Sequence, residues 1–144
     1  MLRGTPAPVI ADGDSIATSG YNAPYLTDID ADDDLDLFIG VLGGAFNPNR
    51  TSADNFHFYE QLPDGSLTLR SVRFLSGIDV GSESIPALAD LDGDGDLDLL
   101  VGNKLDPTTL RSARMFLFRN DGSPIEPAFV LADTLHLPGS YHFG

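Results

Sequence analysis

A segment of 13 residues recurs after a shift of 62 positions, and this repeat limits the possible folds more than any other feature. Residues 28–40 read DIDADDDLDLFIG and residues 90–102 read DLDGDGDLDLLVG. The match extends upstream, because residues 24–27 correspond to residues 86–89. Self-similarity at a fixed period is typical of β-propellers and of other arrays built from one recurring structural unit.

In both copies, aspartates alternate with small or apolar residues. Carboxylates at the first, third and fifth positions converge on one point if the chain curls tightly, and Gly95 at the sixth position supplies the φ freedom that this curl needs. Hard oxygen ligands without nitrogen or sulfur select Ca²⁺, and a flexible loop favours it over Mg²⁺. The candidate ligands are Asp28, Asp30, Asp32, Asp34 and Asp36, with Asp90, Asp92, Asp94, Asp96 and Asp98.

An EF-hand loop begins in the same way but differs at its twelfth position. That position is a bidentate Glu in EF-hands, and helices flank the loop. Here the twelfth position is Val101, in an apolar run where Leu97 and Leu99 share its face in the alternation of a strand. The sequence therefore predicts calcium loops within β-hairpins.

The two Asp loops, their following strands and the repeat spacing resemble the FG-GAP/VCBS repeat family, whose integrin α-subunit members are calcium-bearing β-propellers. The resemblance covers nearly the whole chain and implies two Ca²⁺ sites. Residues 90–98 match the family pattern at every liganding position. Residues 28–36 depart from it, because Asp33 stands where the turn glycine belongs. We therefore expect the second site to bind calcium more tightly.

Repeat boundaries follow from these matches. Residues 1–20 are expected to hold the last strand of a preceding blade and a linker, residues 21–80 and 81–138 one blade each, and residues 139–144 the start of another repeat. The expected strands are 8–11, 24–27, 35–41, 56–60, 67–74, 85–89, 97–102, 115–119 and 128–132. The predicted fold class is all-β: two four-stranded antiparallel propeller blades plus a stray N-terminal strand, as part of a larger propeller.

The charge of the chain is concentrated in the Asp loops. The net charge is −14, with 22 acidic residues against 8 basic ones, and residues 28–36 and 90–98 hold eleven of the acids. With no basic patch to neutralise phosphates, we expect no nucleic-acid partner. No apolar run approaches the roughly 18 residues of a membrane span. There is no cysteine, and the first six residues lack the apolar segment of a signal peptide.

An esterase-like triad can be written from Ser15, His136 and Asp133, because residues 13–16 and 133–136 resemble the terminal motifs of GDSL-type esterases. Against it, residues 12–15 and 133–136 follow equivalent strands and so read as equivalent loops. No helix follows Ser15, and the chain is short for that fold. We expect no enzymatic activity.

The family resemblance implies a binding or adhesion scaffold for a protein or glycan ligand, outside the cell or at its surface. The alternative is a non-catalytic or substrate-positioning portion of a larger secreted enzyme, such as a polysaccharide lyase or hydrolase. The long loops 43–55 and 103–114 are the expected contact surface, because binding residues favour loops on rigid scaffolds. Further partners would be the remaining blades, in a longer chain or in other copies of this chain.

Overall fold

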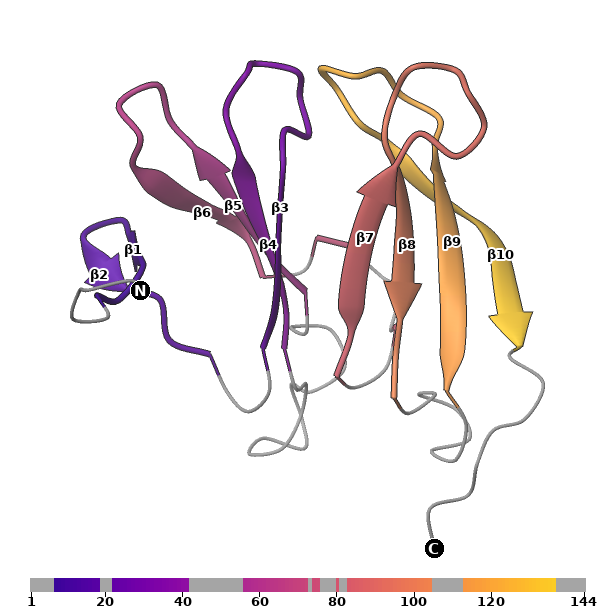
Figure 1. Ribbon diagram of the computed structural model, residues 1–144, viewed down its shortest axis with the longest axis horizontal. Coiled ribbons are helices and arrows are strands. Elements are labelled where there is room, and N and C mark those ends of the chain that lie inside the picture. The colour runs from indigo at the N-terminus through magenta and orange to yellow at the C-terminus, as the bar shows by residue number, and fades with distance from the viewer. Residues whose placement is uncertain are drawn as a thin grey trace, which may run out of the picture.

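The computed structural model of the chain is built from two β-sheets that pack against each other (Figure 1). It describes residues 7–18, 22–41, 56–72, 74–75, 80, 83–104 and 113–136, and these contain strands, turns and bends but no helix. Over the same ranges there is accordingly no helix long and apolar enough for a membrane crossing. The prediction of an all-β fold with propeller-type repeats is confirmed.

The first sheet contains four antiparallel strands in chain order and two short strands at its outer edge. The four are β3 (Ala23–Thr27), β4 (Asp36–Gly40), β5 (Phe56–Gln61) and β6 (Leu67–Ser71). The short strands are β1 (Ile10–Ala11) and β2 (Asp14–Ser15), and the full order is β2-β1-β6-β5-β4-β3.

The second sheet repeats this arrangement without the added edge. Its strands are β7 (Ile85–Ala89), β8 (Asp98–Gly102), β9 (Arg114–Asn120) and β10 (Phe129–His136), in the order β10-β9-β8-β7. The registers of the two sheets agree with the 62-residue shift: Leu26 pairs with Leu37 in one, and Leu88 with Leu99 in the other.

Two expectations about the edges of the sheets are wrong. The N-terminal strand is not stray: Ala11 pairs with Asp14 in β2 and lies parallel to Leu67 in β6. A two-residue Asp12-Gly13 turn with positive φ at both positions (51° and 85°) folds β1 onto β2. Residues 133–136 are not a loop either, because β10 continues through them after a bulge near residue 132.

The main core lies between the two sheets. Alternation along the strands turns Phe38 and Phe58 toward the second sheet, where they pack with Leu99 and Val101. The rings of Phe38 and Phe58 stack with centroids 4.8 Å apart, and the Tyr25 hydroxyl donates a hydrogen bond to the Leu88 carbonyl at 3.1 Å. Burying a side chain of this size contributes about 1.5–3 kcal/mol, so this core holds the sheets together.

A smaller core lies on the opposite face of the first sheet. Leu37, Ile39 and Tyr59 are each 6% exposed there, and Ala11 from the β1–β2 hairpin covers them, with Ile16 packed alongside. The N-terminal segment therefore covers part of the face that the second sheet does not reach.

Candidate metal centres

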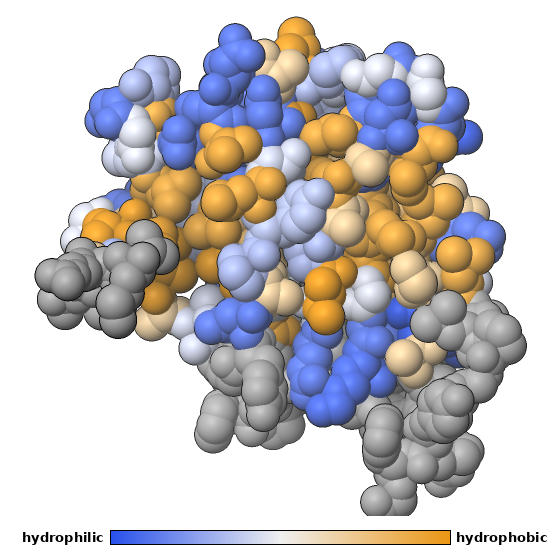
Figure 2. Space-filling model, viewed as in Figure 1, coloured by the Kyte–Doolittle hydropathy of each residue, from blue (hydrophilic) through white to orange (hydrophobic). Residues whose placement is uncertain are grey.

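Both Asp loops lie at the same end of the molecule. The first joins β3 to β4 and the second joins β7 to β8, and both appear at the top of Figure 1. Hydrophilic residues gather at this end in Figure 2, whereas apolar ones lie over the middle of the sheets. The shared β-hairpin framework therefore presents both acidic loops at one end of the molecule.

In each loop three carboxylates converge. Asp28, Asp30 and Asp32 each place a carboxylate oxygen so that the three atoms lie within 4.8 Å of one another. The equivalent residues of the second loop, Asp90, Asp92 and Asp94, meet the same limit. These six are the first, third and fifth positions of the two loops.

Backbone N–H groups hold the first Asp of each loop in place. The Asp28 carboxylate accepts hydrogen bonds from the backbone N–H groups of Asp32 and Asp33, both at 3.1 Å. The Asp90 carboxylate accepts from Gly93 at 2.7 Å and from Gly95 at 3.2 Å. These bonds close the curl that brings the other carboxylates inward.

The curl requires positive φ at two positions of each loop. In the second loop glycines occupy both: Gly93 has φ 85° and Gly95 φ 100°. In the first loop the same positions are Ala31 (φ 59°) and Asp33 (φ 71°). The sequence indicated the unusual φ of Asp33 but not that of Ala31. The signal for Ala31 was Gly93, its equivalent after the 62-residue shift.

The last Asp of each loop, Asp36 or Asp98, is buried and anchors the loop to the sheet. Asp98 accepts hydrogen bonds from the backbone N–H groups of Leu91 at 3.0 Å and Asn120 at 2.9 Å. Asp36 accepts from Ile29 at 3.4 Å and Gln61 at 2.9 Å. Each carboxylate thus ties the loop to the end of the third strand of its sheet. Gln61 and Asn120 donate through their backbone, so their side-chain identities gave no signal for this role.

Several carboxylate oxygens in the loops are buried without a hydrogen-bond partner in the described part of the chain: Asp30 Oδ1, Asp34 Oδ1 and Asp96 Oδ1. Burial, followed by the charges of neighbouring aspartates, raises the pKa values of Asp30 and Asp34. Burial also raises the pKa of Asp36 to about 6, against the lowering effect of its two backbone hydrogen bonds.

The second loop has the same electrostatic character. Burial is the main cause of the raised pKa values of Asp92 and Asp96, and the proximity of Asp94 adds to both. A cluster of negative charges with buried, unpartnered oxygens fits a hard divalent cation, because such a cation supplies the missing positive charge and takes oxygen ligands. The residues present therefore fit Ca²⁺ in both loops.

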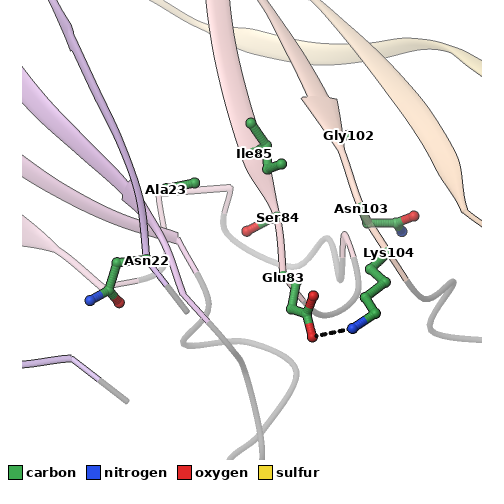
Figure 3. Close-up of a pocket in the computed structure, with 8 residues that line it drawn as sticks. All are labelled: Asn22, Ala23, Glu83, Ser84, Ile85, Gly102, Asn103 and Lys104. Atoms are coloured by element: carbon green, nitrogen blue, oxygen red, sulfur yellow. Dashed lines mark hydrogen bonds and ion pairs between the residues drawn. The ribbon is translucent and has the colours of Figure 1, made fainter. Parts of the chain in front are cut away.

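A second candidate site is a cavity of about 360 Å³ at the opposite end of the two sheets. Figure 3 shows it between the start of β3, the start of β7 and the end of β8, with Glu83 and Lys104 joined by an ion pair of 3.0 Å. Asn103 is held there by donating to the Val80 carbonyl at 2.6 Å and accepting from the Arg114 N–H at 2.7 Å. The sequence pointed to only two of the lining residues, Asn103 and Lys104, which begin the predicted contact loop 103–114. The predicted contact loops 43–55 and 103–114 fall mostly outside the described residues.

The esterase-like triad is not assembled. Ser15 lies in β2 and Asp133 in β10, which are the outer edge strands of different sheets. Figure 1 shows these strands on opposite sides of the molecule. Ser15 and Asp133 therefore cannot belong to one catalytic site.

The fold and the two loops together define a repeat protein of the propeller type. The sequence model described as FG-GAP-like repeat matches residues 28–101, which is just over half of the 144 residues. The chain therefore belongs to the FG-GAP-like repeat family. Repeats of this family are typically non-catalytic scaffolds and are usually extracellular. The searches found no match among curated proteins and none among solved structures.

Proposed function

We propose that the chain binds two Ca²⁺ ions, one in each Asp loop, and serves as an extracellular binding scaffold. The observation that carries the calcium proposal is the duplicated geometry. Three carboxylates converge within 4.8 Å in each loop, and two backbone N–H groups hold the first carboxylate of each. A solvated acidic run would not need to recur with this spacing.

The aspartates at the first, third and fifth loop positions would hold each ion, and the half-buried Asp34 and the buried Asp96 follow them along the chain. Asp36 and Asp98 would complete the sites with the lone pairs that their backbone hydrogen bonds leave free. The ion would offset repulsion of up to about 1 kcal/mol for each close pair of carboxylates in water. Calcium would therefore rigidify the loop end of both sheets.

Native mass spectrometry tests the calcium proposal by counting ions on the folded chain. We expect two Ca²⁺ per chain, and one after Asp94→Ala or after Asp32→Ala, because each variant loses the central carboxylate of one loop. Asp64→Ala is the matched control, since Asp64 is an exposed acid in the β5–β6 turn, outside both loops. A chain that carries no calcium in millimolar metal would contradict the proposal.

The scaffold role concerns the other end of the molecule. The cavity beside Glu83 and Lys104 lies at that end, and Asn103 and Lys104, which line it, are the first residues of the predicted contact loop 103–114. We expect a protein or glycan ligand there. A glycan array and a cell-surface protein array, probed with the calcium-loaded chain and with a Lys104→Ala variant, test this role. A ligand bound equally well by the parent and the variant would place the contact elsewhere.

A further inference from the structure

The second sheet has an apolar face that points away from the first sheet. Register places Ile85, Gly102, Met115 and Leu135 in one row across all four strands. The next row on the same face contains Ala87, Leu100 and Leu117, and it ends at the exposed Asp133 in β10. Ile85 is 63% exposed and Leu135 44% exposed. We call this surface the outward face; it consists of Ile85, Ala87, Leu100, Gly102, Met115, Leu117 and Leu135. A patch that spans a whole sheet is typical of interaction sites.

The repeat shows what covers such a face. In the first sheet, Phe38 pairs with Phe58 and Gly40 with Phe56, as Leu100 pairs with Leu117 and Gly102 with Met115 in the second. These phenylalanines pack in the core between the sheets, against Leu88, Leu99, Val101, Phe116 and Phe118. The equivalent of the outward face is therefore already docked, within the chain, onto the inner face of another repeat.

The two equivalent glycines record the difference directly. A Cβ added at Gly40 would lie 1.8 Å from the carbonyl oxygen of Ser84, which leads into β7. A Cβ added at Gly102 would meet nothing within 4 Å. The same position is thus in close contact in the first sheet and open in the second.

The surface complementary to the outward face is present at the other end of the chain. It is the face of the first sheet that carries Leu26, Leu37 and Ile39, which correspond to Leu88, Leu99 and Val101 after the 62-residue shift. We call it the receiving face; its apolar members are Pro24, Leu26, Leu37, Ile39, Tyr59, Leu67 and Leu69, and the register adds the polar His57 and Gln61.

The β1–β2 hairpin covers only part of the receiving face. Leu26 is 58% exposed and Leu69 42% exposed, whereas Leu88, the equivalent of Leu26, is 6% exposed beneath the first sheet. Besides the packing of Ala11 and Ile16, a small set of contacts attaches the hairpin. β1 has one ladder position on β6. Asp12 donates its N–H to the Leu67 carbonyl at 3.0 Å, and its carboxylate accepts hydrogen bonds from the Leu69 N–H at 2.9 Å and from the Thr68 hydroxyl. A whole sheet would bury more of this face than the hairpin does.

We infer that a second copy of this chain is the partner of both faces: the outward face of one copy docks onto the receiving face of the next, displacing the β1–β2 hairpin. This contact repeats the arrangement of the two sheets within the chain. It joins different surfaces of the two copies, so it generates rings or open filaments. Closed propellers typically have four to eight blades, so a ring would contain about two to four copies.

Sedimentation velocity over a wide range of protein concentration tests this inference. Ile85→Glu blocks the outward face and Leu26→Glu the receiving face, and both side chains are more than half exposed, so neither change disturbs the core. We expect the parent chain to associate and each variant alone to sediment as a single chain. An equimolar mixture of the two variants should give a species of twice that mass and nothing larger. Ile125→Glu, at a 68% exposed turn residue, is the control and should associate like the parent.

The other outcomes overturn the inference. A parent chain that stays a single chain at all concentrations rules out a second copy as the partner. Association lost in only one of the variants would mean that like faces pair, and a mixture that remains single chains would mean that the faces do not fit. If a variant fails to fold, Leu69→Glu and Val130→Glu provide a second pair on the same two sides, at 42% and 49% exposure.

Discussion

The two Asp loops share their carboxylate positions and most of their hydrogen bonds but differ in the residues that adopt positive φ. Gly93 and Gly95 adopt positive φ in the second loop, and Ala31 and Asp33 adopt it in the first. A residue with a side chain pays roughly 1–2 kcal/mol for this conformation, Asp less than Ala. The first loop therefore keeps the ligand geometry at a cost that the second avoids, which shows that the carboxylate arrangement and the backbone strain are separate contributions to a metal site.

Removing calcium should abolish the stabilisation of both loops and with it the difference between them. This is the largest expected effect. Each ion stabilises the folded chain by about 2.7 kcal/mol at a free concentration one hundred times its dissociation constant. Thermal melts in millimolar Ca²⁺ and in excess EDTA should differ by many degrees, while Mg²⁺ at the same concentration restores little. Identical melting curves in the two buffers would mean that the loops are only solvated acidic turns.

Removing one central carboxylate from each loop should then separate the two contributions. Asp94→Ala and Asp32→Ala change equivalent residues, and each should abolish the calcium-dependent stabilisation of its own loop. We expect the second loop to bind calcium about tenfold more tightly, and a tenfold affinity difference corresponds to about 1.4 kcal/mol. At the same calcium concentration, Asp94→Ala should therefore lose about 1–2 kcal/mol more stabilisation than Asp32→Ala. The melts in EDTA serve as the control, since both variants should resemble the metal-free parent there.

A second comparison concerns the glycines at the ends of β4 and β8. Gly40→Ala forces a contact with the Ser84 backbone and should destabilise the fold by about 1–3 kcal/mol, the usual cost of overpacking. Gly102→Ala has open space around it and should leave the stability of the isolated chain nearly unchanged. Denaturant unfolding of the two variants measures the difference, and equal losses would mean that the sheets do not pack in this way.

Sequence reasoning predicted β3, β4, β7 and β8 from the 62-residue shift, and the other four main strands from alternating apolar residues and the turn residues between them. It missed the partners of β1, because the single pairing of Ala11 with Leu67 depends on tertiary packing rather than on the local sequence pattern. It also missed the positive φ of Ala31, because alanine itself favours no such conformation and only the register to Gly93 reveals it. The anchoring of Asp36 and Asp98 was equally hidden, because their partners are backbone N–H groups on distant strands.

Exchanging the positive-φ residues between the loops should change stability least. It tests whether backbone strain causes the difference between the two loops. Ala31→Gly together with Asp33→Gly should stabilise the calcium-loaded chain by about 1 kcal/mol, after the added flexibility of the unfolded chain is subtracted from the strain relieved. Gly93→Ala should have the opposite sign in the second loop. Melts in saturating calcium give both values, and the same sign for the two exchanges would contradict the strain explanation.

The most direct test of the account is isothermal titration of the metal-free chain with calcium. We expect two sites, the tighter one by about tenfold, a difference of about 1.4 kcal/mol that the strain at Ala31 and Asp33 is large enough to cause. Asp94→Ala should remove the tighter site and Asp32→Ala the weaker one. Two equal sites, or a tighter site that disappears with Asp32→Ala, would contradict the account.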